Sequence, residues 1–172
     1  MLSLTTEYMI ELDLTRVNEL APYKLELVHG QYLFETDFGI QYSVSFEPEP
    51  LENGLSAYWF NLSNRSGKAS PGDRKIRATI IFIIEEFFRQ NPDILLYMCD
   101  SANEQQAMRS RLFLRWFDAY GQQADYYSRT EMILDEDEEN YIAIIVRRDH
   151  PRFQEIVDFF DEQVMMFRAN KP

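Results

Sequence analysis

A junction between a predicted strand and a predicted helix carries residues whose types and spacing could do chemistry. Asp100 ends an apolar run, and Gln105 and Arg109 follow one helical turn apart on the apolar side of the helix. A guanidinium keeps its charge at any ordinary pH, so an inward Arg109 requires a carboxylate or several carbonyls as partners. With Asp100 as that carboxylate, the three side chains could bind a phosphate or carboxylate ligand beside a helix N-terminus.

A second polar pair stands near the start of another predicted helix. Asp73 and Arg77 lie one turn apart, in the same sector as the isoleucines of that helix. If the strand and this helix run antiparallel, the pair comes close to Asp100 and joins the first cluster. The cluster is then either a recognition or catalytic pocket or a structural clasp that fastens helix to strand. We favour the clasp, because structural ion-pair networks also bury charged groups.

The elements that must position these residues begin with a β-meander. Alternating apolar and polar residues predict antiparallel strands over residues 23–28, 31–36, 40–46 and 57–62. His29-Gly30 has the length and composition of a two-residue hairpin turn between the first two strands. Pro48 and Pro50 indicate a longer connection, residues 47–54, before the last strand.

Apolar stripes at helical spacing predict three main helices. They cover residues 71–90, residues 102–120, and a segment that begins near residues 149–151 and carries apolar side chains as far as Phe167. Ser70 is the predicted N-cap of the first helix, with Pro71 in its first turn. Ser101 and Glu104 form a capping box for the second helix.

The remaining strands complete an α+β pattern. Residues 94–98 form a continuous apolar run, typical of a strand covered on both faces, and residues 126–134 and 141–147 predict a hairpin across the acidic connection 135–140. The order is β-meander, α, β, α, β-hairpin, α, with an antiparallel or mixed sheet of about six or seven strands. We expect one domain over residues 1–172, with residues 169–172 as a frayed tail. Residues 1–21 form an N-terminal extension of uncertain structure, in which residues 7–12 could be a strand and residues 15–20 a short helix.

Charge and composition narrow the classes of partner and compartment. The net charge of −12 argues against binding to phosphate backbones or anionic membranes. A single cysteine, an N-terminus without the basic region of a signal peptide and the lack of a long apolar run predict a cytoplasmic protein with no membrane association. We expect no metal and no cofactor, because Cys99, His29 and His150 are scattered and no nucleotide-binding motif occurs.

Four segments of the chain occur in the order YLFETDFGIQYSVSF, DRKIRATIIFIIEEFF, CDSANEQQAMRSRLFLRWF and IIVRRDHP. In this succession the chain resembles a small family of bacterial proteins that is catalogued only as a domain of unknown function. The resemblance covers nearly the whole chain from about Tyr23 onward. It implies no activity, so no functional residues are carried over from it.

Three hypotheses for function remain. The first is a protein-binding or regulatory module without enzymatic activity, which fits an acidic chain that lacks a catalytic motif. The second is an enzyme or ligand-binding protein that uses the anion pocket of Asp100, Gln105 and Arg109. The third is nucleic-acid binding, which the overall charge disfavours. The basic residues available for it are Arg111, Arg115, Arg147, Arg148 and Arg152. The sequence identifies no catalytic residue and leaves the oligomeric state open.

Overall fold

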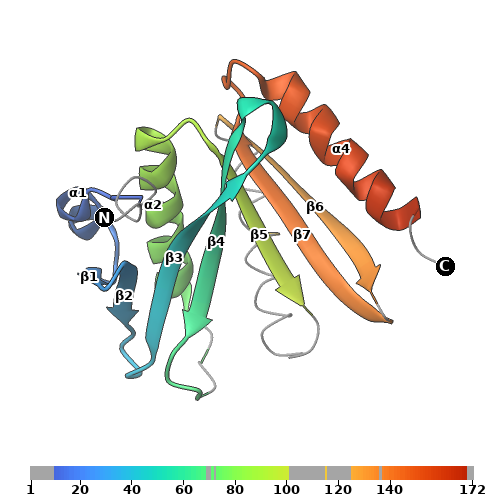
Figure 1. Cartoon of the computed structure of the whole chain (residues 1–172). Helices are drawn as coiled ribbons and strands as arrows, with labels where there is room; N and C mark the ends of the chain where they lie inside the picture. The colour runs from blue at the N-terminus through green and yellow to red at the C-terminus, as the bar shows by residue number, and fades with distance from the viewer. Residues whose placement is uncertain are drawn as a thin grey trace, which may run out of the picture. The chain divides into compact units, whose positions relative to one another are not determined.

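A computed structural model describes residues 10–68, 71, 73–100, 115, 125–135 and 137–169. The chain forms two compact units, Met1–Asp93 and Ile94–Pro172, called here the N-terminal and the C-terminal unit. Within the described residues there are seven strands and three α-helices, α1, α2 and α4, which confirms the predicted α+β class (Figure 1). The second predicted helix, residues 102–120, lies outside the described residues except for Arg115.

Four antiparallel strands form the sheet of the N-terminal unit. They follow the order β1 (Glu26–Val28), β2 (Gln31–Glu35), β3 (Gln41–Pro50) and β4 (Ser56–Asn64). The predicted turn between the first two strands is confirmed: His29 and Gly30 have φ angles of 49° and 78°. Positive φ at both central residues matches the right-handed twist of the strands that the turn joins.

The prediction that residues 47–54 form a connection was wrong in its first half. β3 continues through Pro48, which pairs with Tyr58, to Pro50, and only the 3-10 turn η1 (Glu52–Gly54) then precedes β4. A proline removes a backbone donor, but β2 pairs only with the first part of β3, up to Val44. Beyond Val44, a backbone N–H of β3 that points toward the β2 side has no strand to donate to. A proline at such a position removes no hydrogen bond of the sheet, so both prolines are tolerated there.

Helix α2 (Arg74–Gln90) supplies the core of the N-terminal unit. Its predicted apolar stripe is confirmed: Ile80, Ile83, Ile84, Phe87 and Phe88 are all at most 2% exposed. The ring of Phe87 stacks on that of Phe46 in β3, with centroids 5.1 Å apart. The predicted N-cap was wrong, because the helix begins at Arg74 and its N-cap is Asp73 rather than Ser70.

The described part of the N-terminal extension belongs to the same core. Ile10, Leu12 and Val17 are buried, and α1 (Leu14–Leu20) confirms the short helix expected near residue 15. Asp13 caps this helix by accepting a hydrogen bond from the backbone N–H of Arg16 at 3.2 Å. Residues 10–12 are not in a strand, contrary to one of the options for this segment.

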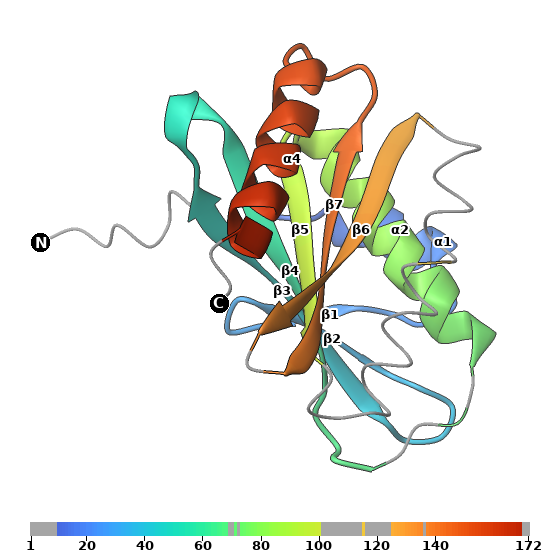
Figure 2. The same cartoon turned by 90° about the vertical axis from the view of Figure 1, so that its right-hand side faces the viewer.

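The C-terminal unit has three antiparallel strands in the order β5 (Ile94–Asp100), β7 (Glu138–Arg147) and β6 (Tyr126–Asp135). Helix α4 (Phe153–Ala169) lies across one face of these strands (Figure 2). The predicted hairpin is confirmed, but its connection is shorter than expected, since Asp135 already pairs with Glu138. None of the described helices is long and apolar enough to cross a membrane.

Strand β5 differs from its prediction at one residue. Ile94, Leu95, Leu96 and Tyr97 are buried, as a strand covered on both faces requires. Met98 is 55% exposed, so the continuous burial predicted for residues 94–98 fails at its last position.

Candidate functional site

A polar cluster surrounds the start of α2. The hydroxyl of Tyr23 donates a hydrogen bond to the Asp73 carboxylate and accepts one from the backbone N–H of Asp37 at 3.2 Å. Lys75 Nζ lies 2.7 Å from the Asp37 carboxylate and 5.8 Å from the centre of the Tyr23 ring. The backbone N–H of Tyr23 also donates to the Thr79 hydroxyl at 3.2 Å. These contacts fasten the segment before β1 and the β2–β3 turn to α2.

The cluster shifts the protonation of its members. Burial and the hydrogen bond to Asp73 raise the pKa of Tyr23 to about 12. The hydrogen bond from Lys75 lowers the pKa of Asp37, and the same bond raises the pKa of Lys75. At neutral pH the tyrosine is therefore a neutral donor and the lysine is charged. Neither state suits a general base, which needs a pKa near the working pH.

The structure locates part of the predicted cluster. Asp73 is the N-cap of α2 and is held by Tyr23, while Arg77 is half-buried one turn further along the helix. Asp100 ends β5 at the position paired with Asn140 in β7. Gln105 and Arg109 lie outside the described residues. The choice between an anion pocket and a structural clasp at Asp100 therefore stays a prediction.

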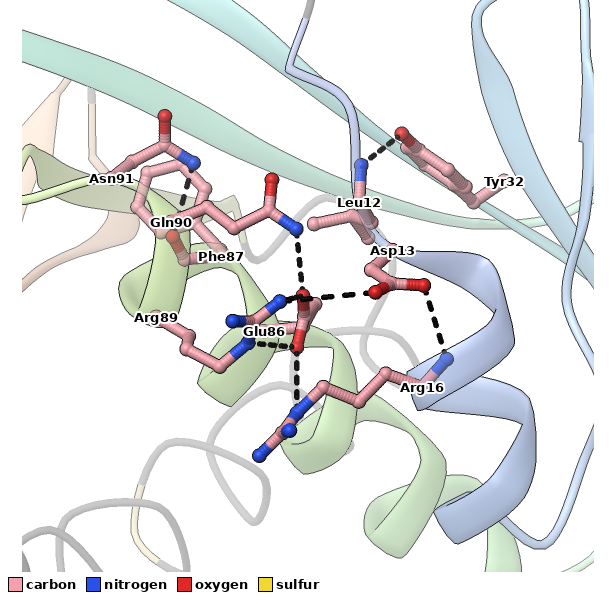
Figure 3. A network of polar contacts seen from close by, with 9 residues as sticks. All are labelled: Leu12, Asp13, Arg16, Tyr32, Glu86, Phe87, Arg89, Gln90 and Asn91. Atoms are coloured by element: carbon pink, nitrogen blue, oxygen red, sulfur yellow. Dashed lines mark hydrogen bonds and ion pairs between the residues drawn. The ribbon is translucent and has the colours of Figure 1, made fainter.

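A second cluster surrounds Glu86 (Figure 3), a residue that sequence reasoning did not select. Its side chain is 3% exposed, in the buried sector of α2. Arg89 donates to both carboxylate oxygens, at 2.9 and 2.7 Å, and the Gln90 amide donates at 2.7 Å. From α1, Arg16 Nε lies 3.4 Å from the same carboxylate. The spacing of Glu86, Arg89 and Gln90 at i, i+3 and i+4 was the available signal.

The partners of Glu86 decide its charge. Burial alone would raise the pKa of the Glu86 carboxyl, but the hydrogen bonds from Arg89 and Gln90 outweigh burial and hold this pKa below its usual range. The carboxylate is therefore charged at neutral pH. Arg89 also lies 3.9 Å from Asp13, so the network joins the N-cap of α1 to the last turns of α2.

The third cluster ties α4 to β6 in the C-terminal unit. The Arg129 guanidinium donates a hydrogen bond to Asp161 of α4, lies 2.7 Å from the Glu131 carboxylate and stacks over the Phe160 ring at 5.4 Å. The bond to Asp161 raises the pKa of Arg129 above its ordinary value. Arg168, in the last turn of α4, reaches Glu131 at 3.0 Å. These four charged groups, Arg129, Glu131, Asp161 and Arg168, therefore hold α4 against β6.

Three of the described arginines proposed for nucleic-acid binding have partners within the protein. Arg147 pairs with Asp149 at 2.8 Å, and Arg152 pairs with Glu155 at 2.6 Å. Arg148 donates to the carbonyl of Tyr126 at 3.0 Å. Arg115 is exposed, whereas Arg111 lies outside the described residues. Neutralised arginines offer little attraction to a phosphate backbone.

Within the described residues, no three His, Cys, Asp or Glu side chains come together as a metal-binding group. Large apolar side chains form a different kind of feature. Among the described large apolar side chains of the C-terminal unit, those exposed by half or more are all methionines: Met98 at 55%, Met165 at 70% and Met166 at 58%. Sequence reasoning did not select any of them.

The chain belongs to a family of unknown function (DUF6169), whose model matches residues 72–162. The matched segment runs from the start of α2 to within α4, so it includes residues of both units. No curated protein matches the chain, and no solved structure does. The match confirms the resemblance noted in the sequence over residues 72–162, a shorter segment than the one expected from about Tyr23 onward, and it assigns no activity.

Proposed function

We propose that this protein is a cytoplasmic protein-binding module whose partner docks on exposed methionines of the C-terminal unit. The observation that carries the proposal is the exposure of every methionine in the described part of the chain. The exposed fractions run from 39% for Met132 to 70% for Met165. Methionine is ordinarily among the more buried residue types, so this distribution needs a cause.

The chemistry of methionine suits a binding surface. Its side chain is unbranched, flexible and polarizable, and can adapt its shape to different apolar partners. Grouped apolar side chains on a protein surface are typical of interaction sites. A methionine surface therefore favours a partner that presents an apolar face, such as an amphipathic helix.

The register of the strands places one of these methionines, Met98, on the sheet face that carries α4. Met98 in β5 is paired with Ile142 in β7, which is paired with Glu131 in β6, so all three residues point to the same face. Glu131 is bonded to Arg168, so this is the face that carries α4. Met165 and Met166 lie in the last two turns of that helix. Met98, Met165 and Met166 are called the methionine surface below.

The three polar clusters support the same proposal because their charged groups already have partners within the protein. Glu86, Asp73 and Arg129 are each engaged by neighbouring side chains, which leaves the methionine surface as the described feature best suited to a partner. A single cysteine in the chain fits the reducing cytoplasm proposed as the compartment.

Affinity capture from the native host tests the proposal. The wild-type protein should recover a partner in stoichiometric amount. The triple variant Met98→Glu, Met165→Glu and Met166→Glu should lose that partner by at least about tenfold, because each charge must be desolvated when the interface forms. Circular dichroism and thermal melting should show that the variant remains folded, because the replaced side chains are exposed.

A matched control places the same charge on exposed apolar residues of the N-terminal unit. Leu20 and Phe38 are 54% and 59% exposed, so the double variant Leu20→Glu and Phe38→Glu should recover the partner as the wild type does. Recovery of the same proteins by the wild type and the methionine variant, or recovery of no stoichiometric partner, would contradict the proposal.

A further inference from the structure

The outer edge of β6 has a backbone pattern that can be deduced from its hairpin. Asp135 and Glu138 flank the two-residue turn, so they form a pair that exchanges backbone hydrogen bonds. The odd-numbered residues of β6 therefore bond to β7, and the even-numbered residues direct their N–H and C=O groups away from it. Arginine contacts agree: the carbonyls of Tyr126 and Met132 accept bonds from Arg148 and Arg168, which are not part of the ladder.

As far as the described residues show, no strand of the chain covers the middle of this edge. β6 stands at the end of the strand order, and β7 is its partner among the described strands. Between the two carbonyls held by arginines lie the outward N–H and C=O groups of Ser128 and Thr130. The strand is ten residues long and contains no proline, which is one of the devices that protect an edge against pairing.

We propose that β6 pairs with β6 of a second copy of this chain, antiparallel and with the two-fold axis at Thr130. In this register Arg129 stands opposite Glu131 of the second copy, and Glu131 stands opposite Arg129 of the second copy. Opposite charges at directly paired positions stabilise a sheet. Thr130 meets its own symmetry mate, and threonine pairs are also favourable across strands.

The charges select this register over its neighbours. The outward N–H and C=O groups of one copy must face the outward groups of the other copy. The two-fold axis can therefore move only in steps of one residue, and each step shifts the pairing by two residues. With the axis at Arg129, two guanidinium groups face each other across the strands. With the axis at Glu131, two carboxylates do so. Like charges at directly opposed positions are destabilising, so the Thr130 register is the complementary one of these three.

The contacts already made at this edge allow the pairing. Arg168 is 55% exposed and touches the Met132 carbonyl at 3.3 Å. A carbonyl oxygen has two lone pairs and can accept a second hydrogen bond from the opposing N–H of Ser128. The pairing is an association between copies and is independent of the proposed partner at the methionine surface.

Sedimentation analysis of the purified protein tests this inference. The wild type should show a monomer–dimer equilibrium at concentrations up to about 200 µM, in keeping with a small interface. Thr130→Pro removes an outward N–H from each copy without removing a bond to β7, and should weaken association by roughly thirtyfold. Thr130→Val keeps the N–H and the branched shape, so it should dimerise as the wild type does.

A second measurement does not depend on the proline. Arg129→Glu and Glu131→Arg each place like charges across the proposed pair, so each variant alone should be monomeric. When the two are mixed, every Arg–Glu pair is restored and a heterodimer should form. A wild type that stays monomeric over this range, a Thr130→Pro variant that dimerises normally, or a mixture that stays monomeric would overturn the inference.

Discussion

At the scale of single residues, Glu86 is the charged group most deeply enclosed in the described N-terminal unit. A carboxylate that is 3% exposed is stable only if its hydrogen bonds replace those that water would make. Arg89 and Gln90 supply three such bonds, and Arg16 adds charge from another helix. The charge of the Glu86 carboxylate, and not only the packing of its side chain, therefore contributes to the stability of the N-terminal unit.

Glu86→Gln should lower the free energy of unfolding by about 1–3 kcal/mol at pH 7, because it replaces a charged acceptor by a neutral one. A carboxyl whose folded pKa is depressed contributes stability above its unfolded pKa and loses it as pH falls through the folded value. The depressed pKa of Glu86 places that loss on the acid side. The difference between wild type and variant, measured by urea unfolding, should thus shrink as the pH is lowered below about 4.

Glu19→Gln is the matched control, since Glu19 is exposed on the neighbouring helix α1. Its unfolding should stay within about 0.5 kcal/mol of the wild type. A Glu86→Gln difference that persists unchanged in acid would show that the charge of Glu86 does not act as described.

Tyr23→Phe removes one hydroxyl and keeps the ring that stacks on Phe34. The loss of the bonds to Asp73 and from Asp37 should cost about 1–2 kcal/mol. Because the folded pKa of Tyr23 is raised to about 12 from 10.0, its contribution is complete below pH 10 and is lost as pH rises through about 12. The variant should lack this part of the alkaline decline in stability.

Tyr42→Phe provides the comparison for this experiment. Tyr42 is also buried, and its ring also stacks on Phe34, with centroids 5.5 Å apart. The two variants would separate the effect of the Tyr23 hydroxyl from that of a buried tyrosine in general. Equal losses in both would contradict the role assigned to the Asp73 bond.

At the scale of elements, helix α4 depends on charged side chains along its border with β6. Asp161→Asn weakens the bond to Arg129 and should cost about 1 kcal/mol, since the group is only partly buried. Hydrogen exchange of the α4 amides should become faster, while the amides of α2 keep their protection. Asp158→Asn, an exposed change one turn away on the same helix, should leave both unaltered. Unchanged exchange in α4 of the Asp161 variant would contradict the proposed fastening.

Sequence patterns predicted most of the elements, for local reasons. The α2 stripe and the His29-Gly30 turn depend on helical spacing and on backbone conformation, which neighbouring residues determine. The extent of β3 was missed because the two prolines were interpreted as breaks. A proline is tolerated in a strand where its side of the strand has no pairing partner. Whether β3 has a partner at its prolines depends on the length of β2, and the sequence of β3 does not contain that information.

The candidate sites were less predictable than the elements. Asp73 and Ser70 are both good N-cap residues, and the hydrogen bond from Tyr23, fifty residues earlier in the chain, favours the former. The partners of Glu86 include Arg16 of helix α1. No periodicity in the sequence predicts where α1 packs against α2. The exposure of Met98 was missed because an apolar run does not reveal how far a helix covers the strand.

At the scale of the whole molecule, the prediction of a single domain can be tested by calorimetry. The family segment, residues 72–162, crosses the boundary between the two units at Asp93. We therefore expect one cooperative transition whose calorimetric and van't Hoff enthalpies agree. Two separable transitions, or independent folding of residues 1–93, would show that the units are separate domains.

The most direct test of the central claim is site-specific photocrosslinking in cells of the native host. A photoreactive amino acid placed at Met98 or Met166 should form an adduct with one partner protein. The same group at Phe38, equally exposed in the N-terminal unit, should form none with that protein. Adducts at all three positions alike, or at none of them, would contradict a protein-binding role for the methionine surface.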